Sequence, residues 1–251
     1  MGNLIRFELR KLYGQKKLYL CGIIAVAVML LYSLIEYGIL SLFSYDPSAL
    51  ELPGAEKVLG VLNTASFVMI CGIFAVLCVT EDYSRKIVKN IFSRGYSRLH
   101  VYLAKYIAVL IGVSLMFVAV ILMATAISAI LYGLRGVDAG TFFKLLAAQY
   151  IVVLANATMA FSIGAMLGKV AAALPIVILA PSILTMILNL IDLFIFKEEE
   201  VIAPYWLGSL LGEVSDVNVS DTRVLICLLL SLGYVAMWLV LGYLPNRRRE
   251  V

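Results

Sequence analysis

Six apolar stretches dominate the sequence, and each is long enough to cross a lipid bilayer as a helix. The hydrocarbon core of a bilayer needs about 20 predominantly apolar residues per helical crossing. Pro175 and Pro181 in the fifth stretch predict a helix that is kinked or broken. We predict an all-α integral membrane protein that forms one transmembrane domain over residues 1–251. The stretches are Leu18–Leu40, Val61–Thr80, Tyr106–Tyr132, Phe142–Leu167, Ala171–Phe196 and Val224–Leu244.

The composition supports a membrane protein rather than a soluble one. Hydrophobic residues make up 63% of the 251 residues and charged residues only 14%, whereas soluble domains have roughly 45–50% apolar and about 25% charged residues. A soluble core of this length has no use for so many apolar side chains, but a lipid-facing surface does. The four cysteines all lie inside apolar stretches, which predicts buried free thiols rather than disulfides or a metal site. They are Cys21, Cys71, Cys78 and Cys227.

The distribution of basic residues predicts the orientation of the chain in the membrane. Fifteen of the 20 Lys and Arg residues fall in residues 1–17, 81–105 and 245–251 or at Lys169. Short loops rich in Lys and Arg stay in the cytoplasm. We therefore expect both termini to be cytoplasmic and residues 197–223 to form an external loop. The expected location is a cell membrane, as a multi-pass protein of the bacterial cytoplasmic membrane.

The first seventeen residues carry a helical pattern. Ile5, Leu9 and Leu12 are spaced i, i+4 and i+7, so they share one face of a helix. The basic residues lie mostly elsewhere, as in helices that lie in the membrane interface. The pattern favours an amphipathic interfacial helix over residues 1–17, and a basic leader that only fixes topology is the alternative.

The segment between the second and third spans, residues 81–105, predicts a short amphipathic helix. Ile87, Ile91 and Phe92 lie on one side of it, and Gly95 ends it. Apolar residues exposed below a membrane need a partner. A groove on a soluble subunit is one such partner, and the lipid headgroups or the protein's own helix ends are another.

Motifs for catalysis or nucleotide binding are missing. The Gly168-Lys169 pair lacks the other residues of a phosphate-binding loop. His100 is the only histidine, and Glu36 and Asp192 are the only acidic residues within the spans, both near their external ends. We expect no catalytic residue, no metal site, no cofactor and no nucleic-acid partner.

The loop after the second span resembles that of the permease subunit of the ABC type-2 exporter family. In that family an acidic residue leaves span two, a short coupling helix follows, and then come a Ser-Arg pair and a Lys at the start of span three. Gly95-Tyr96 stands where the family often has Pro, which is a departure, and Ser97 is expected to cap the helix that enters span three. The matching residues are Glu81, Asp82, Ser97, Arg98 and Lys105.

The resemblance implies a separate ATPase subunit that binds the ATP and docks on this loop. It also implies a second permease subunit, so that the transporter is a homodimer or a heterodimer. Compact permeases of this size are similar to those that export antimicrobial or other amphipathic peptides or confer immunity to them, so a peptide or a hydrophobic molecule is the expected substrate. The residues expected to couple to the ATPase are Glu81, Asp82, Arg85, Lys86, Ile87, Ile91, Phe92 and Arg94.

Two other functions remain open from the residues alone. A secondary transporter would show inverted repeats and ionisable residues near the middle of the membrane, and the sequence shows neither clearly. A channel or scaffold subunit that works without an ATPase is the third possibility. A neighbouring gene for an ATPase would separate the first hypothesis from both.

Polar residues on the fifth span predict a substrate pathway. They recur at positions 0, +3, +7 and +10, which places them on one helical stripe. Together with Glu36 and the acidic run at 198–200, they would favour a cationic amphipathic substrate. Alternatively, the neutral members only bond to neighbouring helices. The stripe consists of Ser182, Thr185, Asn189 and Asp192.

The fourth span carries a ridge of small residues with a period of four. Small residues let helix backbones approach closely, and this packing drives helix association in lipid. We predict a close helix contact along the ridge, either within the subunit or between subunits. The ridge consists of Asn156, Ala160, Gly164 and Gly168.

Overall fold

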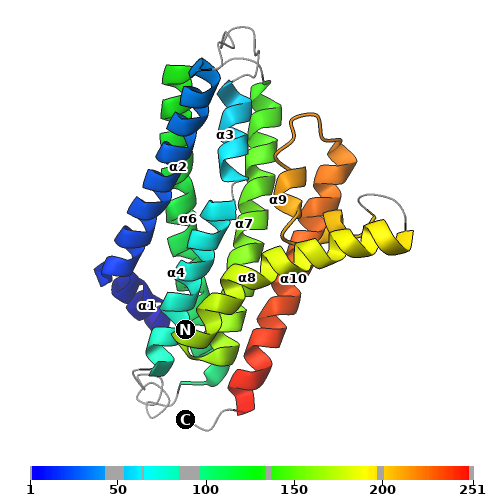
Figure 1. Cartoon of the computed structure of the whole chain (residues 1–251). Coiled ribbons are helices and arrows are strands. Elements are labelled where there is room, and N and C mark those ends of the chain that lie inside the picture. Colours follow the sequence, from blue (N-terminus) through cyan, green and yellow to red (C-terminus); the bar gives the residue numbers. More distant parts are fainter. Residues whose placement is uncertain are drawn as a thin grey trace.

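The protein is a bundle of long helices (Figure 1). The computed structural model describes residues 2–42, 54–63, 65–84, 96–133, 137–196 and 201–248. No strand occurs among these residues. The elements are α1 (Gly2–Gly14), α2 (Lys16–Leu42), α3 (Gly54–Leu62), α4 (Ala65–Ser84), α6 (Arg98–Leu131), α7 (Ala139–Leu167), α8 (Val170–Ile191), a π-helical turn (Asp192–Phe196), a 3₁₀ turn (Ala203–Tyr205), α9 (Leu210–Glu213) and α10 (Asp221–Arg248).

The predicted all-α fold with six membrane-spanning segments is confirmed. Within the described residues, six helical segments are long and apolar enough to cross a membrane. Helix α1 and the end of α10 lie at the same end of the bundle (Figure 1). We call this end the terminal side and the opposite end the far side. That the terminal side is cytoplasmic stays a prediction.

The second span is longer than its apolar stretch and is interrupted. It runs over Gly54–Glu81 and consists of α3 and α4, with a turn at Asn63 between them. The apolar stretch begins only at Val61 because Lys57 interrupts it in the sequence. In the fold, Lys57 forms an ion pair with Glu36 of α2, so the helix continues through the charged position.

Helix α8 runs through both of its prolines without a break. Of the predicted kink or break at Pro175 and Pro181, the break is absent, and an irregular π-helical turn lies at the far end of the helix. In Figure 1, α8 crosses the bundle at a steep angle to the other long helices. Only Ala173 and Val177 of α8 are buried. Helix α8 is therefore loosely attached to the rest of the bundle.

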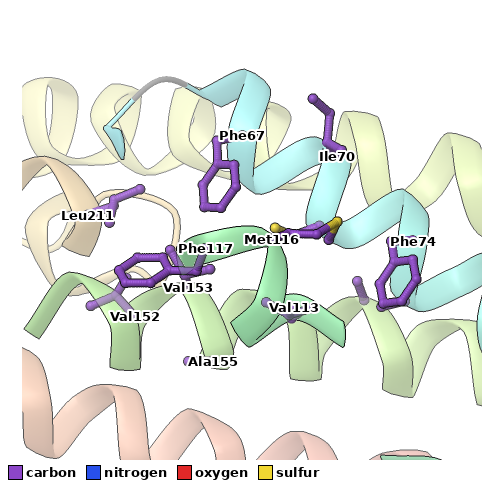
Figure 2. Close-up of a cluster of buried hydrophobic side chains, with 14 of the residues drawn as sticks. Phe67, Ile70, Phe74, Val113, Met116, Phe117, Val152, Val153, Ala155 and Leu211 are labelled. Carbon is purple, nitrogen blue, oxygen red and sulfur yellow. The ribbon is translucent and has the colours of Figure 1, made fainter. Parts of the chain in front are cut away.

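Helix α7 is the most buried of the six spans and packs against α4, α6, α8 and α10. A central cluster of apolar side chains from α4, α6, α7 and α9 fills the space beside it (Figure 2). Dense packing of this kind positions the polar groups described below. The labelled members of the cluster are Phe67, Ile70, Phe74, Val113, Met116, Phe117, Val152, Val153, Ala155 and Leu211.

Part of the predicted external loop at 197–223 forms short helical turns. Its residues 201–215, here called the far-side segment, include the 3₁₀ turn and α9. Leu207, Leu210 and Val214 of this segment are fully buried and join the apolar core. The segment therefore packs against the bundle instead of lying over its surface.

Helix α1 packs against the start of α6. Its buried residues are Leu4, Glu8 and Leu12, whereas Ile5 and Leu9 of the predicted apolar face are only partly buried. The buried face thus differs from the predicted one, and it contains a charged residue. The predicted cap of α6 is confirmed, because the Ser97 side chain accepts a hydrogen bond from the backbone N–H of His100.

Candidate functional site

A cavity of about 730 Å³ lies between α4, α7, α8 and the far-side segment. It has the size of pockets that bury a drug-sized ligand, roughly 300–1,000 Å³. Its wall is mostly apolar and includes Met69, Met159 and Met186. The polar residues in the wall are Asn63, Ser66, Asn156, Ser182, Thr185 and Asn189.

Three residues of the predicted stripe on the fifth span line this cavity. They are Ser182, Thr185 and Asn189 of α8. The Thr185 hydroxyl donates to the carbonyl oxygen of Pro181, one turn back on α8, at 2.9 Å. Ser182 and Asn189 are exposed, so the cavity is open along α8.

Asp192, the fourth residue of the stripe, does not line the cavity. Its side chain is 1% exposed and accepts hydrogen bonds from the backbone N–H groups of Ile202, at 3.0 and 2.9 Å, and Ala203, at 2.9 Å. We expected this carboxylate to reach water near the membrane surface. Instead it caps the 3₁₀ turn and ties the end of α8 to the far-side segment, because backbone donors stabilise the charge.

Glu36 is also placed apart from the cavity, where it pairs with Lys57. Its charge is thereby compensated within the bundle. The acidic run at 198–200 lies outside the described residues. The negative potential that we expected at the exit of the pathway stays a prediction.

The far-side segment contributes Gly208 and Leu211 to the wall of the cavity. Asn156 Nδ2 donates to the carbonyl oxygen of Leu207 at 3.5 Å. Gln149 Nε2, about two turns earlier on α7, donates to Ser215 Oγ at 2.9 Å. At the start of α10, Arg223 Nε donates to the Glu213 carboxylate at 2.9 Å. The segment is thus held by side chains from α7 and α10 as well as by Asp192.

Close helix packing lies beside the cavity, and the predicted ridge of α7 takes part in it. A methyl group added at Gly164 would lie 2.6 Å from Val79 Cγ1 of α4. One added at Gly72 of α4 would lie 3.5 Å from Ala160 Cβ. The structure thus places the ridge against α4 of the same chain. At its end, Gly168 adopts a left-handed conformation, with φ of 65°, and terminates α7.

A buried ion pair joins α1 to α6 on the terminal side. Glu8 Oε1 lies 3.2 Å from Lys105 Nζ, and their side chains are 6% and 5% exposed. At this distance the two opposite charges attract each other strongly. Lys105 is the residue that matches the exporter family at the start of span three, and the structure gives it a partner that the sequence pattern did not indicate.

A second ion pair joins the end of α4 to the start of α2. Glu81 pairs with Lys17, and Gln15 Nε2 donates to Glu81 Oε2 at 3.3 Å. Asp82 belongs to α4, but its side chain is outside the described part of the chain. The two ion pairs bracket residues 82–104, the stretch that resembles a coupling loop. The other residues expected to couple to an ATPase lie outside the described residues: Arg85, Lys86, Ile87, Ile91, Phe92 and Arg94.

Sequence reasoning missed several residues of the site. Asn63 and Ser66 line the cavity from the junction of α3 and α4, and their short polar side chains in an apolar run were a usable signal. Glu8 was recognisable only as an acidic residue on the same helical face as Leu4 and Leu12. Gln149 gave no signal of its own, because its role depends on a segment far away in the chain.

Six apolar helical segments, with a cavity between α4, α7, α8 and the far-side segment, define a multi-pass membrane protein. A sequence model described as "ABC-2 family transporter protein" matches residues 4–198, from α1 past the end of α8. The chain therefore belongs to the ABC-2 transporter family. Membership implies that this chain is the non-catalytic membrane subunit and that an ATPase subunit is its partner. No curated protein sequence matches the chain.

Proposed function

We propose that the protein is the membrane-spanning subunit of an ATP-driven exporter and moves a hydrophobic or amphipathic molecule through the cavity. The observation that carries this proposal is the cavity itself, which combines an apolar, methionine-containing wall with polar groups from three helical spans. Methionine side chains adapt to ligands of different shape. Such a wall suits a substrate with both apolar and polar parts, and an amphipathic peptide is the proposed one, for export or for immunity.

The proposed cycle requires α8 to move relative to α4 and α7. The far-side segment and the helices α4 and α7 form the other walls of the cavity. Helix α8 buries only Ala173 and Val177, so of the three helical walls it has the least packing to lose. A second permease subunit would provide the remaining wall along α8.

ATP hydrolysis by the partner subunit would drive this movement. We propose that the ATPase docks on residues 81–105 and that both bracketing ion pairs transmit the displacement. Glu81 links the loop to α2 through Lys17, and Lys105 links it to α1 through Glu8. Because α2 and α6 also pack against α4, a displacement of the loop would reach one wall of the cavity.

Adjacent cysteines on α8 test the pathway. Met186 lines the cavity and is 65% exposed, whereas Ile187 does not line it and is 47% exposed. In a variant without native cysteines, in membranes that contain the ATPase subunit, Met186→Cys should react with a water-soluble thiol reagent at a rate that changes with the nucleotide state. Ile187→Cys, the matched control, should stay unreactive. Equal rates at both positions in every nucleotide state would refute the pathway.

A further inference from the structure

Several polar side chains of the cavity have no partner within the described protein. Ser66, Ser182 and Asn189 make no side-chain hydrogen bond to another described residue, although all three lie in membrane-spanning helices. In hydrocarbon, each unsatisfied polar group costs several kcal/mol. Lipid chains therefore make a poor occupant of this cavity, and an occupant with hydrogen-bonding groups makes a good one.

The amides in the wall supply both kinds of hydrogen-bonding group. Both recorded side-chain hydrogen bonds of Asn156 are donated by Nδ2, to Val152 and Leu207, so its Oδ1 remains an acceptor for a ligand. Asn189 offers a donor and an acceptor from α8, on another wall of the cavity. A secondary amide has one N–H donor and one C=O acceptor, and two carboxamides on different walls can satisfy both.

The charges of the described wall also restrict the ligand. None of the described residues that line the cavity is Asp, Glu, Lys, Arg or His. The nearest carboxylate on the same stripe, Asp192, is saturated by backbone N–H groups. A charged ligand group would lose its water without gaining a partner, which is costly in a site of this kind.

We infer that the cavity binds an uncharged, amide-bearing portion of an amphipathic molecule, such as a hydrophobic peptide segment, and holds it through Asn189 and Asn156. Any charged groups of the molecule stay outside the cavity. This inference rests on the proposed function and makes it more specific, because it replaces a cationic ligand by a neutral one. The apolar side chains of the segment lie against the methionine-containing wall.

Three matched probes test the inference in nanodiscs that contain the permease with its ATPase. They are N-decanoyl-leucinamide, which is uncharged, N-decanoyl-lysinamide, which is a cation, and N-decanoyl-leucine, which is an anion at neutral pH. The measurement is protection of Met186→Cys from a water-soluble thiol reagent. The uncharged probe should protect at concentrations at least tenfold lower than either charged probe.

Variants at Asn189 test how the probe is held. Asn189→Leu should weaken protection by the uncharged probe about threefold to tenfold, as expected for the loss of one hydrogen bond. Asn189→Gln keeps the amide and should retain most of the protection. Ile187→Ala, on the neighbouring position outside the cavity, should leave protection unchanged.

The outcomes separate this inference from the proposed function. If the cationic probe protected as well as the uncharged probe, the inference would be overturned and the pathway would remain supported. The same would hold if labelling depended on the nucleotide state but no probe affected it. A rate of labelling at 186 that never differs from that at 187 would overturn the pathway itself.

Discussion

Removing one member of the Glu8–Lys105 ion pair should strongly destabilise the protein. The two charges are 3.2 Å apart and almost completely buried. With an effective dielectric constant of about 20, two unit charges at this distance attract each other by about 5 kcal/mol. The cost of removing both from water offsets much of this attraction. Either single substitution, however, leaves the remaining charge buried without its partner, which costs about 3–5 kcal/mol.

The double variant is the informative comparison. Glu8→Leu with Lys105→Met removes both charges and fills the space with apolar groups of similar size, a change that is often neutral or stabilising. We therefore expect Glu8→Leu and Lys105→Met each to lower the stability and the double variant to recover most of the loss. This non-additivity is the signature of a direct interaction between the two side chains.

The buried thiols provide an assay for this prediction. Cys21, Cys71 and Cys227 are buried, so a thiol-reactive fluorescent dye reports their exposure when the protein unfolds in detergent. For a chain of this size, 1 kcal/mol corresponds to about 2–4 °C in Tm, and the single variants should lose about 6–20 °C. Single variants within 2 °C of the original protein, or a double variant that loses the sum of both, would refute the reasoning.

Three further substitutions test other contacts. Gly164→Leu should reduce the yield of folded protein on size exclusion, since overpacking costs about 1–3 kcal/mol. Gly233→Leu is the control and should leave the yield unchanged, because Gly233 has open space around it. Equal yields of the two variants would contradict the close contact of Gly164 with α4. Asp192→Ala should speed hydrogen exchange at the two amides it binds by about 10- to 100-fold, because hydrogen bonds to a charged group contribute about 1.5–3 kcal/mol; unchanged exchange would show that other contacts hold the far-side segment. Ile91→Asp with Phe92→Asp should uncouple ATP hydrolysis from transport; unchanged co-purification of the ATPase together with unchanged transport would refute docking on residues 81–105.

The long helices could be predicted because lipid imposes a simple requirement on length and polarity. Each of the six apolar stretches coincides with one helical span, and two of them pass the end of their span by one residue. The start of the second span was harder to predict, because Lys57 interrupts the apolar stretch and its ion-pair partner Glu36 is known only from the structure. Pro175 and Pro181 suggested a break in α8 that the structure does not have, and a membrane helix can continue through a proline when other groups satisfy the freed carbonyls.

The cavity could be predicted only in part. The period of 3.6 residues places Ser182, Thr185 and Asn189 on one face of α8, and the fold puts that face against the cavity. Asp192 lies on the same face of the helix. Its side chain, however, is positioned by the backbone N–H groups of Ile202 and Ala203, ten and eleven residues further along the chain. The buried leucines of the far-side segment resemble ordinary loop residues in the sequence, because their burial depends on α7 and α10 rather than on a local pattern.

The polar contacts of α7 also set the order in which the protein can be completed during synthesis. Gln149 finds one partner in Leu59, made 90 residues earlier, and another in Ser215, made 66 residues later. At translation rates of about 5–20 residues per second, the later partner follows after about 3–13 s. The hydrogen-bond partner of Asn156, Leu207, is also made later, 51 residues further along the chain. During this interval α7 is in the membrane with incompletely paired amides, so a chaperone or insertase has time to act on it before the far-side segment arrives.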